Sequence, residues 1–118
     1  MKKNVLIVDD SLYMRMVIKE ILEDAGYVVV GLAVNGEEAI ELAFELQPDY
    51  ITLDNILPDM VGTDILKVYK QEGIESKVVI ISAVAQQSTI DEGMSLGAHS
   101  YVVKPFSKND LVATMESV

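Results

Sequence analysis

The chain has 118 residues, half of them apolar, and it carries a net charge of −10 and no cysteine. This length suits one domain with a buried core, and the apolar content argues against disorder. The acidic balance argues against nucleic acid or anionic membranes as partners, because those surfaces attract Lys and Arg. The lack of cysteine excludes disulfide and thiolate chemistry. No apolar stretch approaches the roughly 20 residues that cross a bilayer. We therefore expect a cytoplasmic, single-domain protein over residues 1–118.

Along the chain, β-branched apolar runs alternate with segments of helical periodicity. The runs predict five strands: Val5–Val8, Tyr27–Val30, Tyr50–Leu53, Val78–Ile81 and Tyr101–Val103. Between and after them, apolar residues recur at helical spacing in five groups: Met14, Val17 or Ile18, Ile21 and Ala25; Ala39, Ile40, Ala43 and Phe44; Ile65, Leu66 and Tyr69; Ile90 and Met94; and Leu111, Val112 and Met115. The alternation predicts five strand–helix units.

The expected helices also have recognisable ends. Asn35 with Glu38, and Ser107 with Asp110, are typical of helix starts, because these side chains can accept hydrogen bonds from free backbone amides. The expected stops are Gly26, Pro48, Gly73 and Gly97. Short connections and continuously apolar strands indicate a parallel sheet covered on both faces. The predicted fold is a doubly wound, three-layer α/β/α sandwich with five strands.

Four of the predicted strands are followed directly by side chains that can bind a metal ion or a phosphoryl group. The first leads into Asp9 and Asp10, the third into Asp54, the fourth into Ser82 and the fifth into Lys104. If the strands are parallel neighbours, all of these residues lie at the carboxyl edge of one sheet, where open α/β sheets bind ligands. The pattern therefore predicts a site at that edge.

The three acids would form a cluster whose negative charge must be offset by a cation. Two like charges about 4 Å apart repel by roughly 4 kcal/mol at an effective dielectric of 20. Mg²⁺ would supply that compensation, since it binds a few carboxylates together with water and phosphoryl oxygens. Without metal, at least one carboxylate should have a raised pKa from like-charge repulsion. The alternative interpretation is that Asp9, Asp10 and Asp54 only cap helices or begin turns.

Lys104 and Ser82 favour the functional interpretation. Alone, Lys104 would be an ordinary surface cation and Ser82 an ordinary hydroxyl at a strand end. Beside an acid cluster they complete what a phosphoryl-accepting carboxylate requires: neutralisation of the transferring oxygens and a hydroxyl donor. In that interpretation Asp54 is the nucleophile, because carboxylates can form aspartyl phosphates.

The motifs together resemble the receiver domains of response regulators over essentially the whole chain. The similarity rests on the order and spacing of Val5–Asp10, Leu53–Asp54, Pro58 with Gly62, Ile81–Ala83 and Lys104–Phe106. Two further segments, 13–15 and 82–87, are similar to the stand-alone chemotaxis branch of that family. The resemblance implies the flavodoxin-like strand order 2-1-3-4-5.

The resemblance also implies a role for each site residue. Asp54 would be the phosphoacceptor, and Mg²⁺ would bind Asp10 and Asp54 directly, Asp9 mainly through water, and the backbone carbonyl of Ile56. Ser82 would hydrogen-bond the phosphoryl group.

Three expectations concern the last strand and its end. Lys104 would pair with the phosphoryl group, and the Lys104–Pro105 bond would be cis. Tyr101 would be the switch aromatic that swings inward on phosphorylation. Without the resemblance, Tyr101 is an ordinary strand aromatic.

At the level of function, the resemblance implies a phosphoacceptor switch in two-component signalling, with self-catalysed phosphorylation and autodephosphorylation, and not a conventional enzyme. The implied partners are a histidine kinase, a flagellar motor switch protein and a phosphatase, and we expect a monomer. A phosphorelay intermediate, or a receiver cut from a longer regulator, would share every site residue.

Two other classes have weaker support in the sequence. A metal-dependent phosphohydrolase would want a second acid two residues after Asp54, where Ile56 stands. A flavin-binding electron carrier would share the topology, but the chain has no Trp and no evident loop to hold phosphate. His99 has no ligand partner in the sequence and is interpreted as a surface residue.

Ile56 and Val84 are apolar where many relatives carry polar groups that influence dephosphorylation. Neither side chain can orient an attacking water by a hydrogen bond, so we expect spontaneous loss of phosphate to be altered, and slowed in particular.

Overall fold

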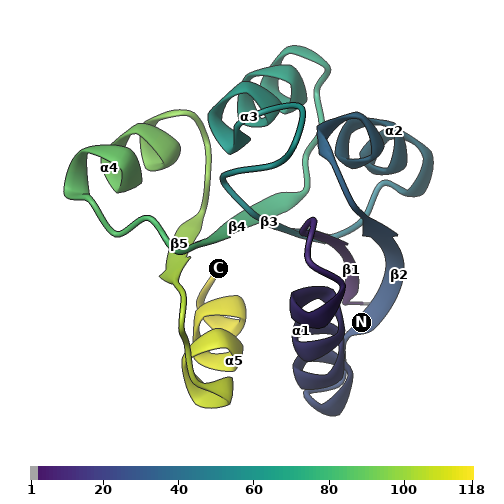
Figure 1. Ribbon diagram of the computed structural model, residues 1–118. Helices are drawn as coiled ribbons and strands as arrows, with labels where there is room; N and C mark the ends of the chain where they lie inside the picture. Colours follow the sequence, from purple (N-terminus) through teal and green to yellow (C-terminus); the bar gives the residue numbers. More distant parts are fainter. Residues whose placement is uncertain (1–2) are drawn as a thin grey trace.

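The computed structural model describes residues 3–118. Met1 and Lys2, which precede the first predicted strand, lie outside the described residues. Strands and helices alternate strictly along the chain (Figure 1). In chain order they are β1 Asn4–Val8, α1 Leu12–Asp24, β2 Val28–Ala33, α2 Gly36–Leu46, β3 Tyr50–Leu53, α3 Gly62–Gln71, β4 Lys77–Ser82, α4 Gln87–Ser95, β5 Ser100–Val103 and α5 Lys108–Ser117.

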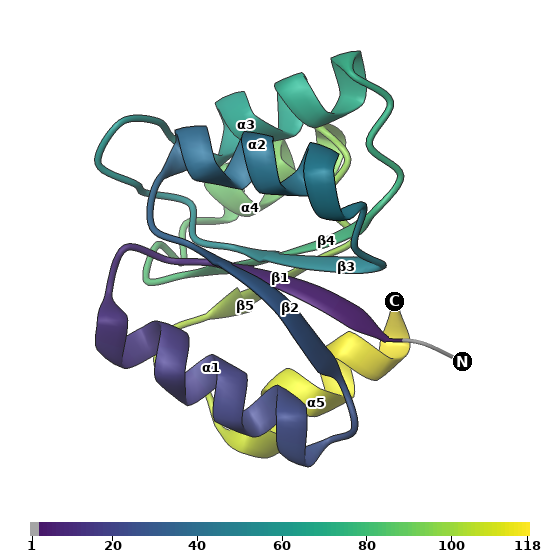
Figure 2. The same cartoon turned by 90° about the vertical axis from the view of Figure 1, so that its right-hand side faces the viewer.

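The five strands form one parallel sheet in the order β2-β1-β3-β4-β5. Helices α2, α3 and α4 cover one face, while α1 and α5 cover the other (Figure 2). The predicted three-layer sandwich and its strand order are therefore confirmed. The direction in which strands are added reverses between β1 and β3, which is where open sheets of this type leave a crevice for ligands.

Each face of the sheet has its own apolar core, because successive strand residues point to opposite sides. Leu6 and Val8 belong to the core beneath α2, α3 and α4. Val5 and Ile7 belong to the core that α1 and α5 cover. Thr52 lies within β3, and its buried hydroxyl oxygen has no hydrogen-bond partner among residues 3–118. The central strands β1, β3 and β4 are thus largely buried on both sides, as their continuous apolar runs predicted, whereas the edge strands β2 and β5 are only partly buried.

The first two helices differ in detail from the expectation. In α1 the buried residues are Ile18 and Leu22, which decides in favour of Ile18 over Val17. In α2 the helix packs through Ala39 and Ala43, whereas Phe44 is 45% exposed. Small side chains let α2 lie close to the sheet, so the larger ring is left at its margin.

The second strand begins one residue later than predicted. β2 starts at Val28, and Tyr27 lies just before it, buried and packed edge-on against Tyr50 with ring centroids 5.6 Å apart. Tyr27 therefore contributes to the core as the strand begins and not as a paired strand residue.

Helix ends follow the sequence signals closely. Asn35 accepts a hydrogen bond from the Glu38 amide at 2.8 Å, and the Glu38 carboxylate accepts from the Val34 amide at 3.0 Å. Ser107 and Asp110 form a complete reciprocal cap on α5. Gly26, Gly73 and Gly97 all have positive φ, which glycine adopts without steric cost. The predicted stops after α1, α3 and α4 are confirmed.

At the amino end of β4, His99 lies exposed, as expected, but it is also bonded to the sheet. Its Nδ1 atom accepts a hydrogen bond from the Val78 amide at 3.2 Å, and its own amide donates to the Val78 carbonyl at 2.7 Å. The imidazole and the backbone of His99 thus fasten β5 to the beginning of β4.

Within residues 3–118, no helix has the length and apolar character needed to span a bilayer.

Candidate functional site

The predicted strand endings meet at the carboxyl edge of the sheet. The register pairs Val8 with Leu53, so Asp9 and Asp54 follow neighbouring strands at the same level. Ser82 ends β4 and is paired with Val103, the residue before Lys104. The Lys104 amide donates to the Ser82 carbonyl at 2.8 Å, which continues the pairing of the two strands past their ends.

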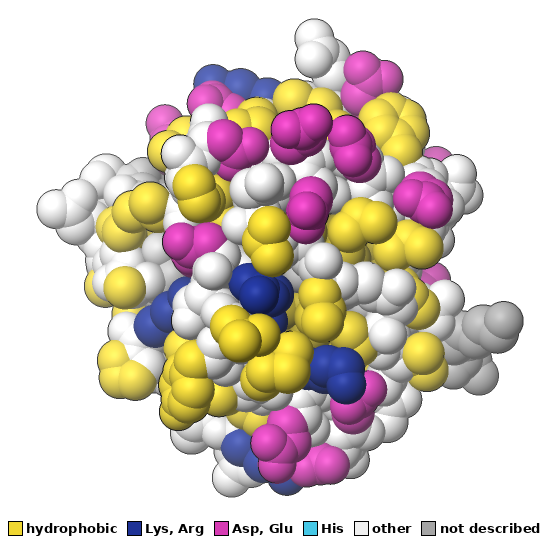
Figure 3. All heavy atoms as spheres, turned by 45° about the vertical axis from the view of Figure 1, so that its right-hand side comes forward, with side chains coloured by type: hydrophobic (Ala, Val, Ile, Leu, Met, Phe, Trp, Pro, Cys, Tyr) yellow, Lys and Arg dark blue, Asp and Glu magenta, His cyan; other side chains and the backbone are white. Residues whose placement is uncertain are grey.

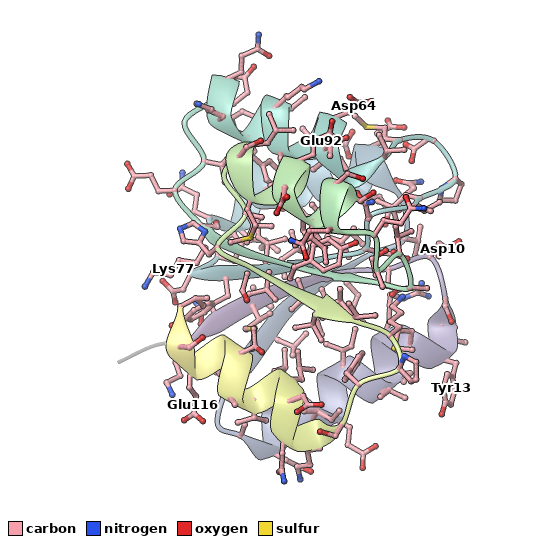
Figure 4. All side chains as sticks on the ribbon, turned by 90° about the vertical axis from the view of Figure 1, so that its left-hand side faces the viewer. Asp10, Tyr13, Asp64, Lys77, Glu92 and Glu116 are labelled. Atoms are coloured by element: carbon pink, nitrogen blue, oxygen red, sulfur yellow. The ribbon has the colours of Figure 1, made fainter. Side chains whose placement is uncertain are left out.

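Asp9, Asp10 and Asp54 form a compact acid cluster at this edge. Each offers a carboxylate oxygen, and these oxygens lie within 4.8 Å of one another. Asp9 is 1% exposed and Asp54 8%, whereas Asp10 stands at the turn into α1 and is exposed. Figure 4 shows Asp10 at the end of the sheet opposite Lys77, where β4 begins. The cluster is therefore buried at its base and open to solvent at Asp10.

Lys104 is the cation that offsets part of this charge. Its Nζ atom lies 2.8 Å from Oδ2 of Asp9 and 3.5 Å from Oδ2 of Asp54. The other oxygen of Asp9 accepts a hydrogen bond from the Ser11 amide at 2.9 Å. Both oxygens of Asp9 are thus engaged by protein groups. The peptide bond from Lys104 to Pro105 is cis, as predicted.

Burial raises the pKa of the Asp54 carboxyl above its ordinary value. The positive charge of Lys104 lowers this pKa in part, while the negative charge of Asp9 raises it further. The predicted direction of this pKa shift is confirmed. The predicted main cause is wrong, since desolvation raises the pKa of Asp54 more than like-charge repulsion does. Asp54 is therefore a carboxylate whose negative charge is poorly solvated, which favours contact with cations.

Two apolar residues flank the site, and their backbones turn toward it. The Ile56 amide donates to Oδ1 of Asp54 at 3.3 Å, and the Val84 amide donates to the Ser82 hydroxyl at 3.2 Å. The Ile56 side chain is 57% exposed and that of Val84 is partly buried. Each residue thus gives its amide to the side chain two positions earlier.

Tyr101 lies on β5 beside this region and is partly buried. Its hydroxyl donates a hydrogen bond to the Val84 carbonyl at 2.6 Å. The ring therefore bridges β5 to the loop that follows Ser82. Since Val84 also binds the Ser82 hydroxyl, Tyr101 and Ser82 contact the same residue.

Sequence reasoning missed two residues around the site. The Arg15 guanidinium donates to the Asp9 carbonyl at 2.7 Å, which brings a second cation close to the acid cluster. The Asp59 carboxylate accepts hydrogen bonds from the amides of Gly36 and Glu37, and these bonds hold the pKa of Asp59 below its ordinary value. Both contacts involve backbone groups, six residues away for Arg15 and 22 and 23 residues away for Asp59, and backbone groups leave no residue-type signal in the sequence.

The surface beside this edge is uneven in charge. Figure 3 shows acidic side chains gathered over the upper part of this face, Lys and Arg among apolar side chains near its middle, and further acidic side chains at its lower end. Helix α2, on the acidic side, carries Glu37, Glu38, Glu41 and Glu45. Large apolar side chains exposed on α1 include Leu12 and Tyr13, at 65% and 75%. The surroundings thus combine a field that attracts cations with an apolar surface.

The donor set at the edge fits a hard divalent cation. Three carboxylates and one lysine leave a charge of −2 if all four groups are ionised, and all three acids offer oxygen. Mg²⁺ and Ca²⁺ prefer oxygen ligands, and Mg²⁺ keeps several waters, which the exposure of Asp10 allows. The described residues can therefore hold such an ion.

Comparison with known proteins decides the family. Residues 5–116 match the response regulator receiver domain. The chain belongs to this family. It is 42% identical to the chemotaxis protein CheY of Thermotoga maritima over 118 residues, which covers 100% of this chain and 98% of that protein. It is also 42% identical to CheY of Bacillus subtilis over 106 residues, which covers 90% of this chain and 88% of that protein.

Solved structures agree with this assignment. The receiver domain superposes with a TM-score of 0.93 on a chain in the CheX–CheY–BeF3–Mg complex of Borrelia burgdorferi. The two chains are 28% identical, and the match covers 97% of this chain and 87% of that one. The family places the chain in two-component signalling, among switch proteins similar to chemotaxis regulators. It also decides against the phosphohydrolase and flavin-carrier alternatives.

Proposed function

We propose that Asp54 accepts a phosphoryl group from a histidine kinase in a Mg²⁺-dependent reaction. One observation carries the proposal: the Asp54 carboxylate is clustered with Asp9 and Asp10 and lies 3.5 Å from the Lys104 ammonium. A nucleophilic carboxylate, further acids for a metal and a cation for the transferring oxygens are the parts that phosphoryl transfer requires. They come from the ends of three strands and the turn after β1.

In the proposed reaction, an oxygen of Asp54 attacks the phosphorus of a phosphohistidine. A P–O bond forms while the P–N bond breaks, and the departing imidazole keeps the electron pair and takes a proton from water. Lys104 stabilises the negative charge on the phosphoryl oxygens. In the second half of the cycle, water attacks the phosphorus: a P–O bond to the water oxygen forms, the P–O bond to Asp54 breaks, and phosphate leaves while the Asp54 oxygen keeps the electron pair as a carboxylate. The chain thus acts as a self-catalysing switch and not as a conventional enzyme.

Mg²⁺ is the proposed cofactor of this step. Asp10 and Asp54 would bind it directly, the Ile56 carbonyl would add a ligand, and Asp9 would act through water. The engagement of both Asp9 oxygens by Lys104 and Ser11 supports the indirect role of Asp9. When bound, the ion neutralises phosphoryl oxygens and brings them to Asp54. The Borrelia CheY complex, which contains Mg, supports the choice of metal.

Phosphorylation would then reach the surface through Ser82 and Tyr101. Ser82 would donate its hydroxyl hydrogen to the new phosphoryl group, and a move of this hydroxyl toward that group would lengthen the bond that its oxygen now accepts from the Val84 amide. Because Tyr101 is bonded to the Val84 carbonyl, a shift of this loop would change the position of the ring. The proposed result is a population shift of the surface formed by α4, β5 and α5.

The proposed partners follow from the chemotaxis relatives: a histidine kinase upstream, a flagellar motor switch protein downstream and a phosphatase. We propose that residues 1–118 act as one monomeric domain in the cytoplasm. A phosphorelay receiver would share the whole site and differ only in its partners. A kinase pull-down with the chain as bait distinguishes the two.

Acetyl phosphate tests the central step without a kinase. Wild type, incubated with acetyl phosphate and Mg²⁺, should gain the mass of one phosphoryl group in an intact-mass spectrum, and EDTA should prevent the gain. Asp54→Asn should gain none, whereas Asp64→Asn, an exposed acid on α3, should be labelled as wild type is. Equal labelling of Asp54→Asn and wild type would remove the proposal.

A further inference from the structure

The loop between β3 and α3 is folded on itself as a compact turn. Ile56 pairs with Val61 as an isolated antiparallel bridge, and the Leu57 amide donates to the Met60 carbonyl at 3.0 Å. The Gly62 amide donates to the Asn55 carbonyl at 2.6 Å and closes its base. We call residues 56–61 the acceptor turn. Because of these internal bonds, a contact that fixes the tip of the turn also fixes the position of Ile56.

The tip of the acceptor turn is fastened to α2 by one side chain. Asp59 accepts hydrogen bonds from the Gly36 amide at 2.7 Å and from the Glu37 amide at 3.0 Å, one on each carboxylate oxygen. These partners lie 23 and 22 residues away in the sequence. Bonds from backbone amides to a carboxylate are strong, and the first turn of a helix favours negative charge. Figure 2 shows the turn projecting past the sheet edge beside the start of α2.

A second contact fits the same surfaces together. The Met60 side chain lies against Gly36, where an added Cβ atom would come 2.6 Å from the Met60 sulfur and 2.8 Å from its Cβ. Only glycine at position 36 admits this approach. Because α2 packs on the sheet through buried Ala39 and Ala43, it offers a fixed support for the turn.

We infer that Asp59 is a positioning residue for the metal site, because it ties the acceptor turn to α2 and so holds the Ile56 carbonyl in place relative to Asp10 and Asp54. This inference rests on the proposed Mg²⁺ function. Asp59 itself touches neither the metal nor the phosphoryl group. Asp59 lies near its own amide and that of Met60, as a turn aspartate does, but one hydrogen bond on each of its oxygens comes from a separate helix.

Mg²⁺ titration by calorimetry tests the inference. Asp59→Ala should weaken Mg²⁺ binding by about tenfold, the lower end of losses seen when groups supporting metal ligands are removed. Asp64→Ala is the matched control, because it removes the same charge from the neighbouring α3. The Asp64 carboxylate makes one weak contact there, with an exposed lysine at 4.0 Å. The dissociation constant of this control should stay within about twofold of wild type, as expected for screened surface charge. Equal affinities of Asp59→Ala and Asp64→Ala would overturn the inference.

Amide spectra give a readout that loss of charge alone would not produce. In wild type, Mg²⁺ should shift the amide resonances of Gly36 and Glu37 as well as that of Ile56, since the turn connects them. In Asp59→Ala the shifts at positions 36 and 37 should vanish. Gly36→Ala, which displaces Met60 without changing charge, should weaken Mg²⁺ binding in the same direction. Unchanged binding in Gly36→Ala, with Met60 displaced, would contradict the role of this docking.

The outcomes separate this inference from the proposed function. If wild type binds no Mg²⁺, the proposed function and the inference both fail. If wild type binds and Asp10→Asn does not, the site stands, and the Asp59 variants alone decide the inference. Acetyl phosphate labelling adds a further test, because saturating Mg²⁺ should restore the rate of Asp59→Ala but not of Asp54→Asn. If Asp59→Ala fails to fold, Asp59→Asn, which keeps one acceptor oxygen, replaces it in every comparison.

Discussion

The segments that follow β3 and β4 start alike and then diverge. Each strand is followed or ended by a polar side chain, Asp54 or Ser82, and the residue two positions on donates its amide back to that side chain. After Asp54 the chain forms the closed acceptor turn and continues into α3. After Ser82 it forms an open loop and continues into α4. Two neighbouring strands thus present the same local geometry on different supports.

The two helices differ sharply in how they are held. α3 buries Ile65, Leu66 and Tyr69, and the Tyr69 hydroxyl donates to the Ala39 carbonyl of α2 at 2.8 Å. In α4, which lies wholly within the described residues, Gly93 is the one buried residue. The proposed acceptor therefore stands on a firm support, and the proposed responding segment on a weakly packed one. A switch gains from this division, since the site keeps its geometry while the surface moves.

The largest expected effect is on the core contacts of the two helices. Ile65→Ala should lower the free energy of unfolding by about 3 kcal/mol, because Ile65 is fully buried. Ile90→Ala in α4 should cost less than about 1 kcal/mol, because that side chain is only partly buried. Urea unfolding at constant slope measures both. Similar losses would erase the contrast between α3 and α4.

The next largest effect is on the pH dependence of stability, which should differ between variants of Asp54 and of Ser82. Since burial raises the pKa of Asp54, the metal-free folded state binds its proton more tightly than the unfolded chain does. The contribution of Asp54 to stability is full below its unfolded pKa and is lost as pH rises through the folded pKa. In EDTA, Asp54→Asn should remove this loss and be more stable than wild type at neutral pH, whereas Ser82→Ala should leave the pH slope unchanged. A slope that survives in Asp54→Asn would contradict the argument.

A smaller effect concerns the two tyrosine hydroxyls. Tyr69→Phe leaves the buried Ala39 carbonyl without this donor and should cost about 1.5 kcal/mol. Tyr101→Phe removes a partly exposed bond to the Val84 carbonyl and should cost about 0.5 kcal/mol. Thermal unfolding of the two variants under the same buffer gives the order. The reverse order would mean that the loop after β4 is held as firmly as α3.

The smallest expected effect is on dephosphorylation. Exchanging Ile56 for Asn together with Val84 for Glu introduces groups that can orient an attacking water, and should speed loss of phosphate by about threefold. Phosphate release after removal of acetyl phosphate measures the rate. Val28→Glu, a substitution at an exposed position on β2, is the control and should have no effect. An unchanged rate in the double variant would show that these positions do not limit the reaction here.

Much of the fold and of the site could be predicted from the sequence because strand ends are marked by residue type. The runs before Asp54 and Lys104 are apolar and short, so their carboxyl ends are unambiguous, and a parallel sheet brings such ends together. The exposure of Phe44 was not predictable, because helical spacing does not reveal how closely a helix packs. The main cause of the raised pKa of Asp54 was also misjudged, since burial depends on the surrounding loops.

Contacts to the backbone were the other gap. Arg15 reaches a carbonyl and Asp59 reaches two amides, and every residue except proline has both groups. A side chain that binds them is therefore not matched by any complementary residue elsewhere in the sequence. Such partners can be found only when the fold has brought the segments together.

Two hydrogen bonds join His99 to Val78, and they make the two ends of the β4–β5 pair unequal in how firmly they are held. At its amino end the pair is clamped through both the backbone and the imidazole of His99. At its carboxyl end Ser82 and Lys104 are joined by one backbone bond beside the open loop. The amino end of the pair thus has one side-chain bond more than the carboxyl end, so a displacement that begins at Ser82 meets less resistance in the loop after Ser82 than at the base of the sheet.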